Sequence, residues 1–321
     1  MEFDHRPSPR CVRLIAEIER LSGNWDRLKE SEALASPDRR AAAIRGGVHA
    51  MLMLDVTYPL DQRKAAVGLE AAHELGPLSF TFAELAELYQ VLTGGGDRRD
   101  SQLGAVFRTI ATDFESPDEL EESIFPTVSP FLIERRLREL LEWIRSELEL
   151  RTYHPLILAA AFHVLFLQIH PFPRANHRMA FVLLWHLLNQ SGFDFVAYDH
   201  IAVRCNRRRG EYFSALRRAE RTTHGTWHTL NGWLEFLLEV VRDCGEMVMH
   251  QANRQTEARR LTDVQQQIVE VIRSVGPATR DAIVRATGIN ESTVKYNLGV
   301  LTRKGHLQRS GGGRTTNYQV I

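Results

Sequence analysis

Two apolar segments separated by a short polar loop place the strongest restriction on how this chain folds. Residues 155–169 and 179–188 are almost free of charged side chains. Each is long enough for a buried helix, and both are shorter than the roughly 20 apolar residues that a membrane span requires. The loop between them, residues 170–178, reads HPFPRANHR. The pattern predicts two buried helices that hold a histidine, an asparagine and an arginine on one loop.

These three side chains suit a site that binds phosphate and moves a proton. Backbone N–H groups at the start of a helix lack partners within the helix and attract anions. Asn176 and Arg178 lie at such a start, and the guanidinium of Arg178 can pair with a phosphate oxygen. His170 can accept a proton because its ordinary pKa lies near neutrality. The alternative is a plain helix–loop–helix corner with a buried histidine.

Composition indicates a soluble protein of two or three domains. The chain has 321 residues, of which 44% are hydrophobic and 25% charged, as in ordinary globular proteins. The residues after Met1 are acidic and do not resemble a signal peptide. The three cysteines, Cys11, Cys205 and Cys244, fit neither a metal spacing nor a disulfide framework. We therefore expect a cytoplasmic protein without a membrane partner or a metal site.

Charge is unevenly distributed along the chain, although the formal net charge is zero. Residues 261–321 carry eight basic and four acidic side chains, a net charge of +4. The remaining 32 basic and 36 acidic side chains leave the rest of the chain at −4. A basic terminal segment on an acidic body indicates contact with nucleic acid at that end.

Apolar residues recur with helical spacing through most of the chain, so the predicted fold class is mainly α. Residues 108–130 are the exception, because prolines interrupt them and periodic apolar positions are few. We expect a small β-hairpin or an irregular flap there. Besides the two apolar segments, the helices are predicted at residues 13–28, 39–56, 61–73, 82–92, 133–148, 208–220 and 227–252.

The last sixty residues predict a separate unit. A helix capped by Asp263 runs to Val275, a short helix covers 279–286, and a third begins at Asn290 or Ser292. Two strands, 306–309 and 316–321, follow, joined by a glycine-rich turn at 310–314. Helices followed by a β-hairpin are the pattern of a winged-helix domain.

A winged helix commonly places its third helix in the major groove of DNA. We expect Thr293, Tyr296 and Asn297 to face base edges and Lys295 and Arg303 to contact phosphates. Arg314 at the tip of the hairpin suits a phosphate or the minor groove. Such domains usually bind DNA as dimers, so a homodimer is expected. The alternative is a winged helix that serves only protein contacts.

Residues 170–178 resemble the signature of the Fic family, which is His-Pro-Phe, any residue, an acidic residue, Gly or Ala, Asn, Gly or Lys, and Arg. Segments beyond the loop are similar to the family as well, so the resemblance covers residues 80–245. They are Gly104–Thr109, which precedes the family's target-docking flap, His154–Ile157, Glu211–Leu216, Trp227 and Trp233–Phe236. The resemblance implies a helical core with a hairpin flap. The predicted domains are 1–79, 80–252 and 261–321.

Fic proteins mostly transfer AMP from ATP to a hydroxyl group of a target protein. The resemblance implies that His170 is the general base, that Asn176 shapes an anion hole and that Arg178 holds a phosphate. Three positions depart from the signature. Arg174 replaces the acidic metal ligand, His177 adds bulk where backbone must approach phosphate, and Phe181 replaces a second arginine. Because a guanidinium cannot coordinate a cation, magnesium-dependent transfer is expected to be weakened or lost.

Arg174 also allows a second interpretation. Its guanidinium can neutralise phosphates directly, so that ATP or another nucleotide binds without magnesium. In both interpretations Arg174, Asn176 and Arg178 are the candidate phosphate-binding residues.

Many Fic proteins carry an inhibitory helix with Ser or Thr, three residues, Glu, and Gly or Asn. Residues 49–57 are the best local match, with Met51, Asp55 and Val56 at these positions. The match is poor, and a plain helix with an apolar stripe is the alternative. Phe181 replaces the arginine that such a glutamate would pair with. We therefore expect both the transfer activity and its inhibition by this helix to be lost.

Three functions follow from these observations. The first is a DNA-binding regulator whose Fic domain is a pseudoenzyme that senses a nucleotide or a protein. The second is an active adenylyltransferase whose winged helix selects the target, with a target or regulatory protein at the flap. The third is a purely structural interaction module.

Overall fold

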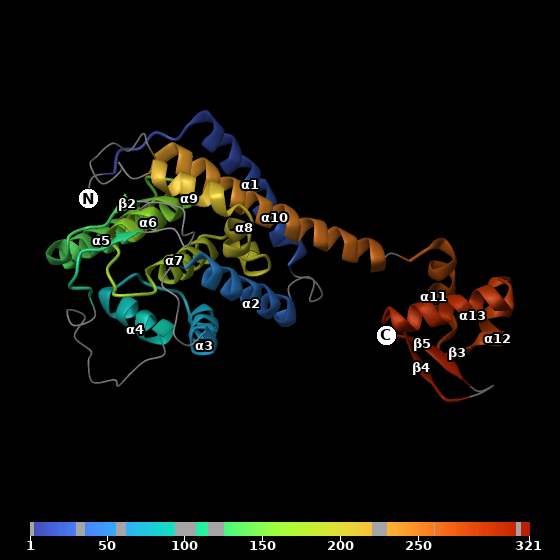
Figure 1. The fold of residues 1–321 in the computed structure, drawn as a ribbon. Coiled ribbons are helices and arrows are strands. Elements are labelled where there is room, and N and C mark those ends of the chain that lie inside the picture. The colour runs from blue at the N-terminus through green and yellow to red at the C-terminus, as the bar shows by residue number, and fades with distance from the viewer. Residues whose placement is uncertain are drawn as a thin grey trace. The chain divides into compact units, whose positions relative to one another are not determined.

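The computed structural model describes residues 3–29, 36–55, 62–93, 107–114, 125–219, 230–259, 261–312 and 316–321. They divide into two compact units, Met1–Gln251 and Ala252–Ile321 (Figure 1). The predicted region 1–79 is therefore part of the first unit, in which α2 packs against α7 and α8.

The first unit is helical, as the sequence predicts. Its helices are α1 (Pro9–Leu28), α2 (Pro37–Leu54), α3 (Gln62–His73), α4 (Phe82–Thr93), α5 (Ile133–Leu150), α6 (Pro155–Ile169), α7 (Asn176–Gln190), α8 (Ile201–Arg207), α9 (Arg209–Arg218) and most of α10 (Asn231–Arg259), whose last residues belong to the second unit. Two 3₁₀ turns, η2 (Pro130–Leu132) and η3 (Asp194–Ala197), precede α5 and α8. Sequence periodicity missed α8, and α10 extends beyond its predicted end at residue 252.

Local chemistry explains where several of these helices begin. The Ser8 hydroxyl accepts the N–H of Cys11, and Ser36 accepts that of Arg39, while a proline occupies the first turn of each helix. A serine followed by proline supplies both a side-chain cap and a backbone angle suited to a helix start. The His154 ring caps α6 in the same way.

α6 and α7 form the centre of the core. All residues from Leu156 to Ile169 and from Asn176 to Leu188 are buried. In Figure 1, α1 and α10 run side by side across one side of this pair, and α2, α3 and α4 lie on the other. A helix surrounded by other helices needs apolar side chains around its whole circumference, which explains the two apolar segments.

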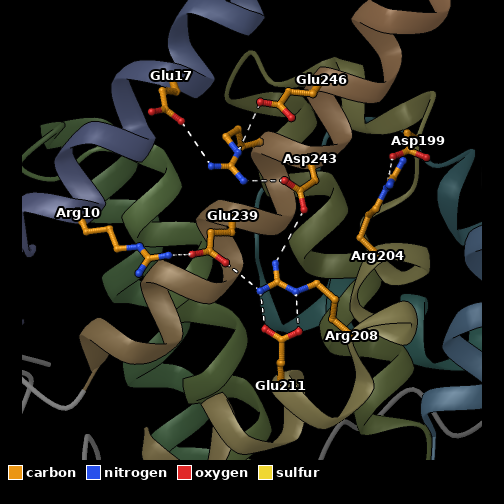
Figure 2. Close-up of polar contacts among 10 residues, drawn as sticks. Arg10, Glu17, Asp199, Arg204, Arg208, Glu211, Glu239, Asp243 and Glu246 are labelled. Carbon is orange, nitrogen blue, oxygen red and sulfur yellow. Dashed lines mark hydrogen bonds and ion pairs between the residues drawn. The ribbon is translucent and has the colours of Figure 1, made fainter.

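Charged side chains join α1, α9 and α10 (Figure 2). Arg208 pairs with Glu211 at 2.6 Å and with Glu239 at 2.8 Å, and Glu239 also pairs with Arg10 of α1. Asp243 connects Arg208 to Arg242. Because these side chains remain partly exposed, the network contributes more to orientation than to stability.

The predicted flap begins as a small hairpin. Strand β1 (Asp113–Phe114) pairs antiparallel with β2 (Phe125–Pro126). Residues 115–124, between the two strands, lie outside the described residues, as do Gly104 and Trp227 of the resemblance.

The second unit contains α11 (Asp263–Val275), β3 (Ala278–Thr279), α12 (Arg280–Thr287), α13 (Glu291–Arg303), β4 (Leu307–Ser310) and β5 (Asn317–Val320). The strands form an antiparallel sheet in the order β3-β5-β4. Val294, Leu298 and Leu301 of α13 pack in its core, as the sequence predicts. Thr262, rather than Asp263, caps α11, because Gln265 completes a capping box with it.

Candidate functional site

The loop between α6 and α7 has two residues in the left-handed conformation. His170 has φ 49° and Ala175 has φ 63°, values that non-glycine residues seldom adopt without supporting contacts. His170 ends α6, and Ala175 precedes Asn176, the first residue of α7. The loop therefore turns sharply at both ends, and no side chain caps the first N–H groups of α7.

Asn176 holds the loop in this shape. Its side-chain oxygen accepts the N–H of Phe172 at 2.9 Å, and its amide nitrogen donates to the Phe172 carbonyl at 2.7 Å. This reciprocal pair occupies both polar ends of the side chain. Asn176 therefore holds the loop in shape through Phe172, and its role at an anion hole stays a prediction.

Phe172 anchors the loop to α4. Its buried ring stacks on Tyr89 with centroids 4.2 Å apart and planes 10° apart. The Tyr89 hydroxyl is hydrogen-bonded to Arg174, which is exposed. Arg174 is thus directed toward the same side of the loop as Arg178, whose charge also acts on Tyr89.

Arg108 joins the loop to the base of the flap. Its guanidinium donates to the carbonyls of His170 at 2.6 Å and Ile110 at 2.8 Å, and to the Thr127 hydroxyl at 2.8 Å. It also contacts the Val128 carbonyl. Arg108 is only 5% exposed. The one signal in the sequence is that Arg108 is the single charged residue of Gly104–Thr109.

His170 is held as a neutral ring. Burial, followed by the charge of Arg108, lowers its pKa to about 3. A neutral imidazole has the protonation state of a general base. Its low pKa makes it a weak one, since proton transfer is most efficient when the pKa lies near the working pH.

The end of α2 lies directly against the loop. Arg178 donates from Nε to Oδ2 of Asp55 at 2.5 Å, and both side chains are 3% exposed. Asp55 stands at the glutamate position of residues 49–57, the segment that matches the family's inhibitory helix poorly. The sequence predicted only that the pairing with a second arginine is lost at Phe181, and it did not predict this pair. Asp55 pairs with the first arginine of the signature, so it does not need the arginine that Phe181 replaces.

His177 holds the same end of α2. Its Nδ1 lies 2.9 Å from the Leu54 carbonyl, and its Nε2 lies 2.6 Å from the Tyr212 hydroxyl. The adjacent Met53 carbonyl accepts from Arg209 at 2.7 Å. His177 is therefore not merely bulk beside a phosphate. It is a buried connection between α2, α7 and α9.

Phe181 belongs to the core. It is fully buried and packs on His163, His177 and Tyr212, with ring centroids 5.0 to 5.7 Å apart. Position 181 therefore offers no charge to the loop.

The side chains around the loop do not fit a divalent cation. Position 174, where the signature places an acidic ligand, offers a guanidinium, and the nearby carboxylate of Asp55 is engaged with Arg178. Magnesium requires anionic or carbonyl oxygens. No cluster of three or more His, Cys, Asp or Glu side chains suited to a metal occurs among the described residues.

Part of the chain that includes this loop is similar to a known family. Residues 79–188, which run from the start of α4 through the loop to α7, match the Fic/DOC family. This stretch of the chain is similar to Fic/DOC domains. A 96-residue stretch is 34% identical to the probable protein adenylyltransferase aq_aa38 of Aquifex aeolicus (strain VF5). It covers 30% of this chain and 27% of that protein, so the chain spans about a quarter of the relative's length.

Solved structures agree with the Fic fold. A Fic family protein from Desulfovibrio desulfuricans G20 aligns over 100% of this chain and 98% of its own, with a TM-score of 0.64 and 19% identity. A fragment of Fic-1 from C. elegans aligns over 76% of this chain and 73% of its own, with a TM-score of 0.55 and 16% identity. At these identities the similarity concerns the fold alone.

The predicted DNA contacts lie in the second unit. Lys295 and Tyr296 on α13 are exposed, as is Arg303 at its end, and Thr293 is half-buried. Asn297 was wrongly placed at base edges. It is 7% exposed, and its side chain bonds to Gln265 at 3.0 Å and to the Thr293 carbonyl at 2.9 Å. Arg314 lies outside the described residues.

The described helices also bear on a membrane role. None of them combines the length and the apolar composition that crossing a membrane requires.

Proposed function

We propose that this protein is a DNA-binding regulator whose Fic domain has lost AMP transfer and serves as a sensor of a nucleotide or a protein. The observation that supports it most directly is the buried pair between Asp55 and Arg178. The proposal includes a homodimer, with a regulatory protein at the flap.

The Asp55–Arg178 pair opposes phosphate binding at Arg178. An incoming phosphate would have to displace a carboxylate that is already hydrogen-bonded in a site with little access to water. Breaking a buried ion pair costs about 3–5 kcal/mol unless the arriving group replaces it fully. Arg174 adds a second obstacle to metal-assisted transfer. It places a guanidinium where the reaction would need a carboxylate that binds the metal ion.

A labelling assay tests the loss of transfer. The protein is incubated with ATP labelled on the α-phosphate, with and without magnesium, alone and in a cell lysate. We expect no label on any protein from the natural chain and label from the Arg174→Asp variant if only the metal ligand is missing. Incorporation by the natural chain that disappears in His170→Ala would contradict the proposal.

DNA binding is proposed for the second unit, with α13 in the major groove. Its net charge of +4, its exposed Lys295, Tyr296 and Arg303, and its three helices followed by a hairpin support a winged-helix role. Thr293 is kept as a candidate base contact, and Arg314 as a candidate phosphate contact.

A salt titration of DNA binding tests this proposal. We expect a gel shift that weakens as salt rises, and a shallower salt dependence in the Lys295→Gln and Arg303→Gln variants. Arg273→Gln, on the exposed surface of α11, is the matched control and should change binding less. Absence of binding at low salt would favour the purely structural module.

An active protein adenylyltransferase is the second candidate. His170, Asn176 and Arg178 are all present, and the similarity to aq_aa38 supports it. In this case Asp55 is a removable inhibitor, and ATP is bound by Arg174 and Arg178 without magnesium. The variant Asp55→Asn separates the candidates, since a gain of labelling with Arg174 intact would favour the transferase.

A further inference from the structure

We propose that a cleft at the far end of α2 and α7 binds a small organic carboxylate through Arg40. The cleft is separate from the loop and gives the proposed sensor a ligand site of its own. Because it lies outside the transfer machinery, its test does not depend on whether the Fic domain is active.

The cleft has a volume of about 340 Å³, at the lower end of the range for small-molecule sites. The buried Trp185, His186 and Ala197 form its floor, and the partly exposed Arg40, Asp194 and Tyr198 stand at its edge. These residues come from α2, α7 and η3 and its C-terminal flank, which the core holds in fixed positions. The backbone that shapes the cleft is therefore in place before any ligand arrives.

Arg40 is a cation without a carboxylate. Among the described residues, its guanidinium makes a long hydrogen bond to the His73 carbonyl at 3.4 Å and lies 5.8 Å above the Trp185 ring, and it pairs with no carboxylate. Other arginines at the edges of this unit are paired, such as Arg204 with Asp199 and Arg208 with Glu211. Arg40 is half-buried, which makes an unpaired charge costlier than on the open surface.

Unsatisfied polar atoms gather at the same cleft. Nε of Arg40, Nε1 of Trp185 and Oδ1 of Asp194 are buried and have no hydrogen-bond partner among the described residues. All three residues line the cleft. Buried polar groups are rarely left without partners, so a ligand that turns these side chains toward the cleft would give them partners that they now lack.

The charges identify the chemistry of that ligand. The guanidinium of Arg40, partly exposed at the edge of the cleft, matches a carboxylate, which Arg binds in a planar, two-point geometry. Asp194 accepts from Lys29 at 3.0 Å through Oδ2 and its side chain is 36% exposed, so this carboxylate can also attract an ammonium group. Amino acids, which carry both groups, are therefore expected to bind better than simple acids of the same size.

The cleft shares its two helices with the loop. α2 carries Arg40 near its start and ends beside Asp55, and α7 carries Arg178 near its start and Trp185 toward its end. The fifteen residues from Arg40 to Asp55 span about 22 Å of helix. A ligand that fixes Arg40 therefore also restrains the helix whose other end holds Arg178.

Calorimetric titration and thermal unfolding of the full chain test the proposal. The probes are glycine, alanine, leucine and glutamate, the acids acetate and pyruvate, and ethanolamine as an amine without a carboxylate. We expect at least one carboxylate to bind and raise the melting temperature, at least tenfold weaker binding in Arg40→Gln, and partial recovery in Arg40→Lys. Arg45→Gln, an exposed position on the same helix, should bind like the natural chain.

Three results would overturn the proposal: no binding by any carboxylate, equal binding by ethanolamine, or equal binding in Arg40→Gln that remains folded. Asp194→Asn should weaken amino acids more than acetate or pyruvate. In hydrogen exchange, the ligand should slow exchange at Leu54 and Asp55. An unchanged rate there would remove the link to the loop.

Discussion

At the scale of single residues, His177 shows how one substitution acquires a structural role. Its ring joins the Leu54 carbonyl to the Tyr212 hydroxyl, which in turn lies 3.1 Å from Nε2 of His163. Burial lowers the pKa of both histidines to about 3, so both rings are neutral at pH 7. Glycine, which the family usually has at this position, would leave a cavity and would remove the partner of the Leu54 carbonyl, while the Tyr212 hydroxyl would keep His163.

We therefore expect His177→Gly to lower the free energy of unfolding by about 3 kcal/mol, measured by urea denaturation. His49→Gln, an exposed histidine on α2, is the control and should leave stability unchanged. If His177→Gly is as stable as the natural chain, the ring does not hold α2 in the way described.

Arg108 is a positioning residue for His170. Replacing it with methionine leaves the buried carbonyls of His170 and Ile110 without a donor, and we expect a loss of about 3 kcal/mol in urea denaturation. Removing its charge should also raise the pKa of His170, because that charge now lowers it. Proton NMR titration of the His170 ring measures the shift, which loss of packing elsewhere would not produce.

At the scale of elements, α2 contains two adjacent glycines with opposite surroundings. A Cβ on Gly47 would lie 2.2 Å from the ring of His200, whereas a Cβ on Gly46 would meet only Val203, at 3.7 Å. Gly47 thus allows the close approach of α2 and the His200 that caps α8, while Gly46 has no such role.

Alanine at the two positions should act in opposite directions. Gly46→Ala is expected to stabilise the protein by up to about 1 kcal/mol through helix propensity. Gly47→Ala should destabilise it by about 2 kcal/mol through overpacking. Chemical denaturation measures the free energy of unfolding of both variants. A stabilised Gly47→Ala would mean that α2 and α8 are not in contact.

Most elements were readable from periodicity, and the exceptions have identifiable causes. The stripe in α5 was correct because Leu137, Leu140, Leu141 and Ile144 face the core. α8 was missed because its seven residues include Arg204 and Arg207 and show too little periodicity. The two-residue β3 was missed because it forms only by pairing with β5.

At the scale of the whole molecule, buried neutral histidines make stability depend on pH. Nδ1 of His200 accepts the N–H of Ala202, so its Nε2 donates to Nε2 of His73 at 2.9 Å. His73 in turn donates from Nδ1 to the Leu69 carbonyl at 2.6 Å. Burial lowers the pKa of His73 to about 4 and that of His200 well below its ordinary value. The pair is thus complete only when both rings are neutral.

The folded chain binds fewer protons than the unfolded chain once the pH falls below 6.5. Stability is therefore complete above that pH and decreases as the pH falls from 6.5 toward 4, by about 1.4 kcal/mol per pH unit for each such histidine. Urea midpoints at pH 7.5, 6.0 and 5.0 measure the decrease. His73→Gln should make it shallower, whereas His250→Gln, which changes an exposed ring, should not. A midpoint independent of pH would contradict the assignment.

The sequence by itself determined the helical class, the two buried helices and the loop with His170, Asn176 and Arg178, because these depend on local periodicity and on neighbours in the chain. Only the tertiary structure decided what the loop touches. Asp55 lies 123 residues from Arg178, and the amide of Asn297 faces Gln265 instead of solvent. Contacts between distant segments depend on how the helices pack. Local patterns in the sequence do not show that packing.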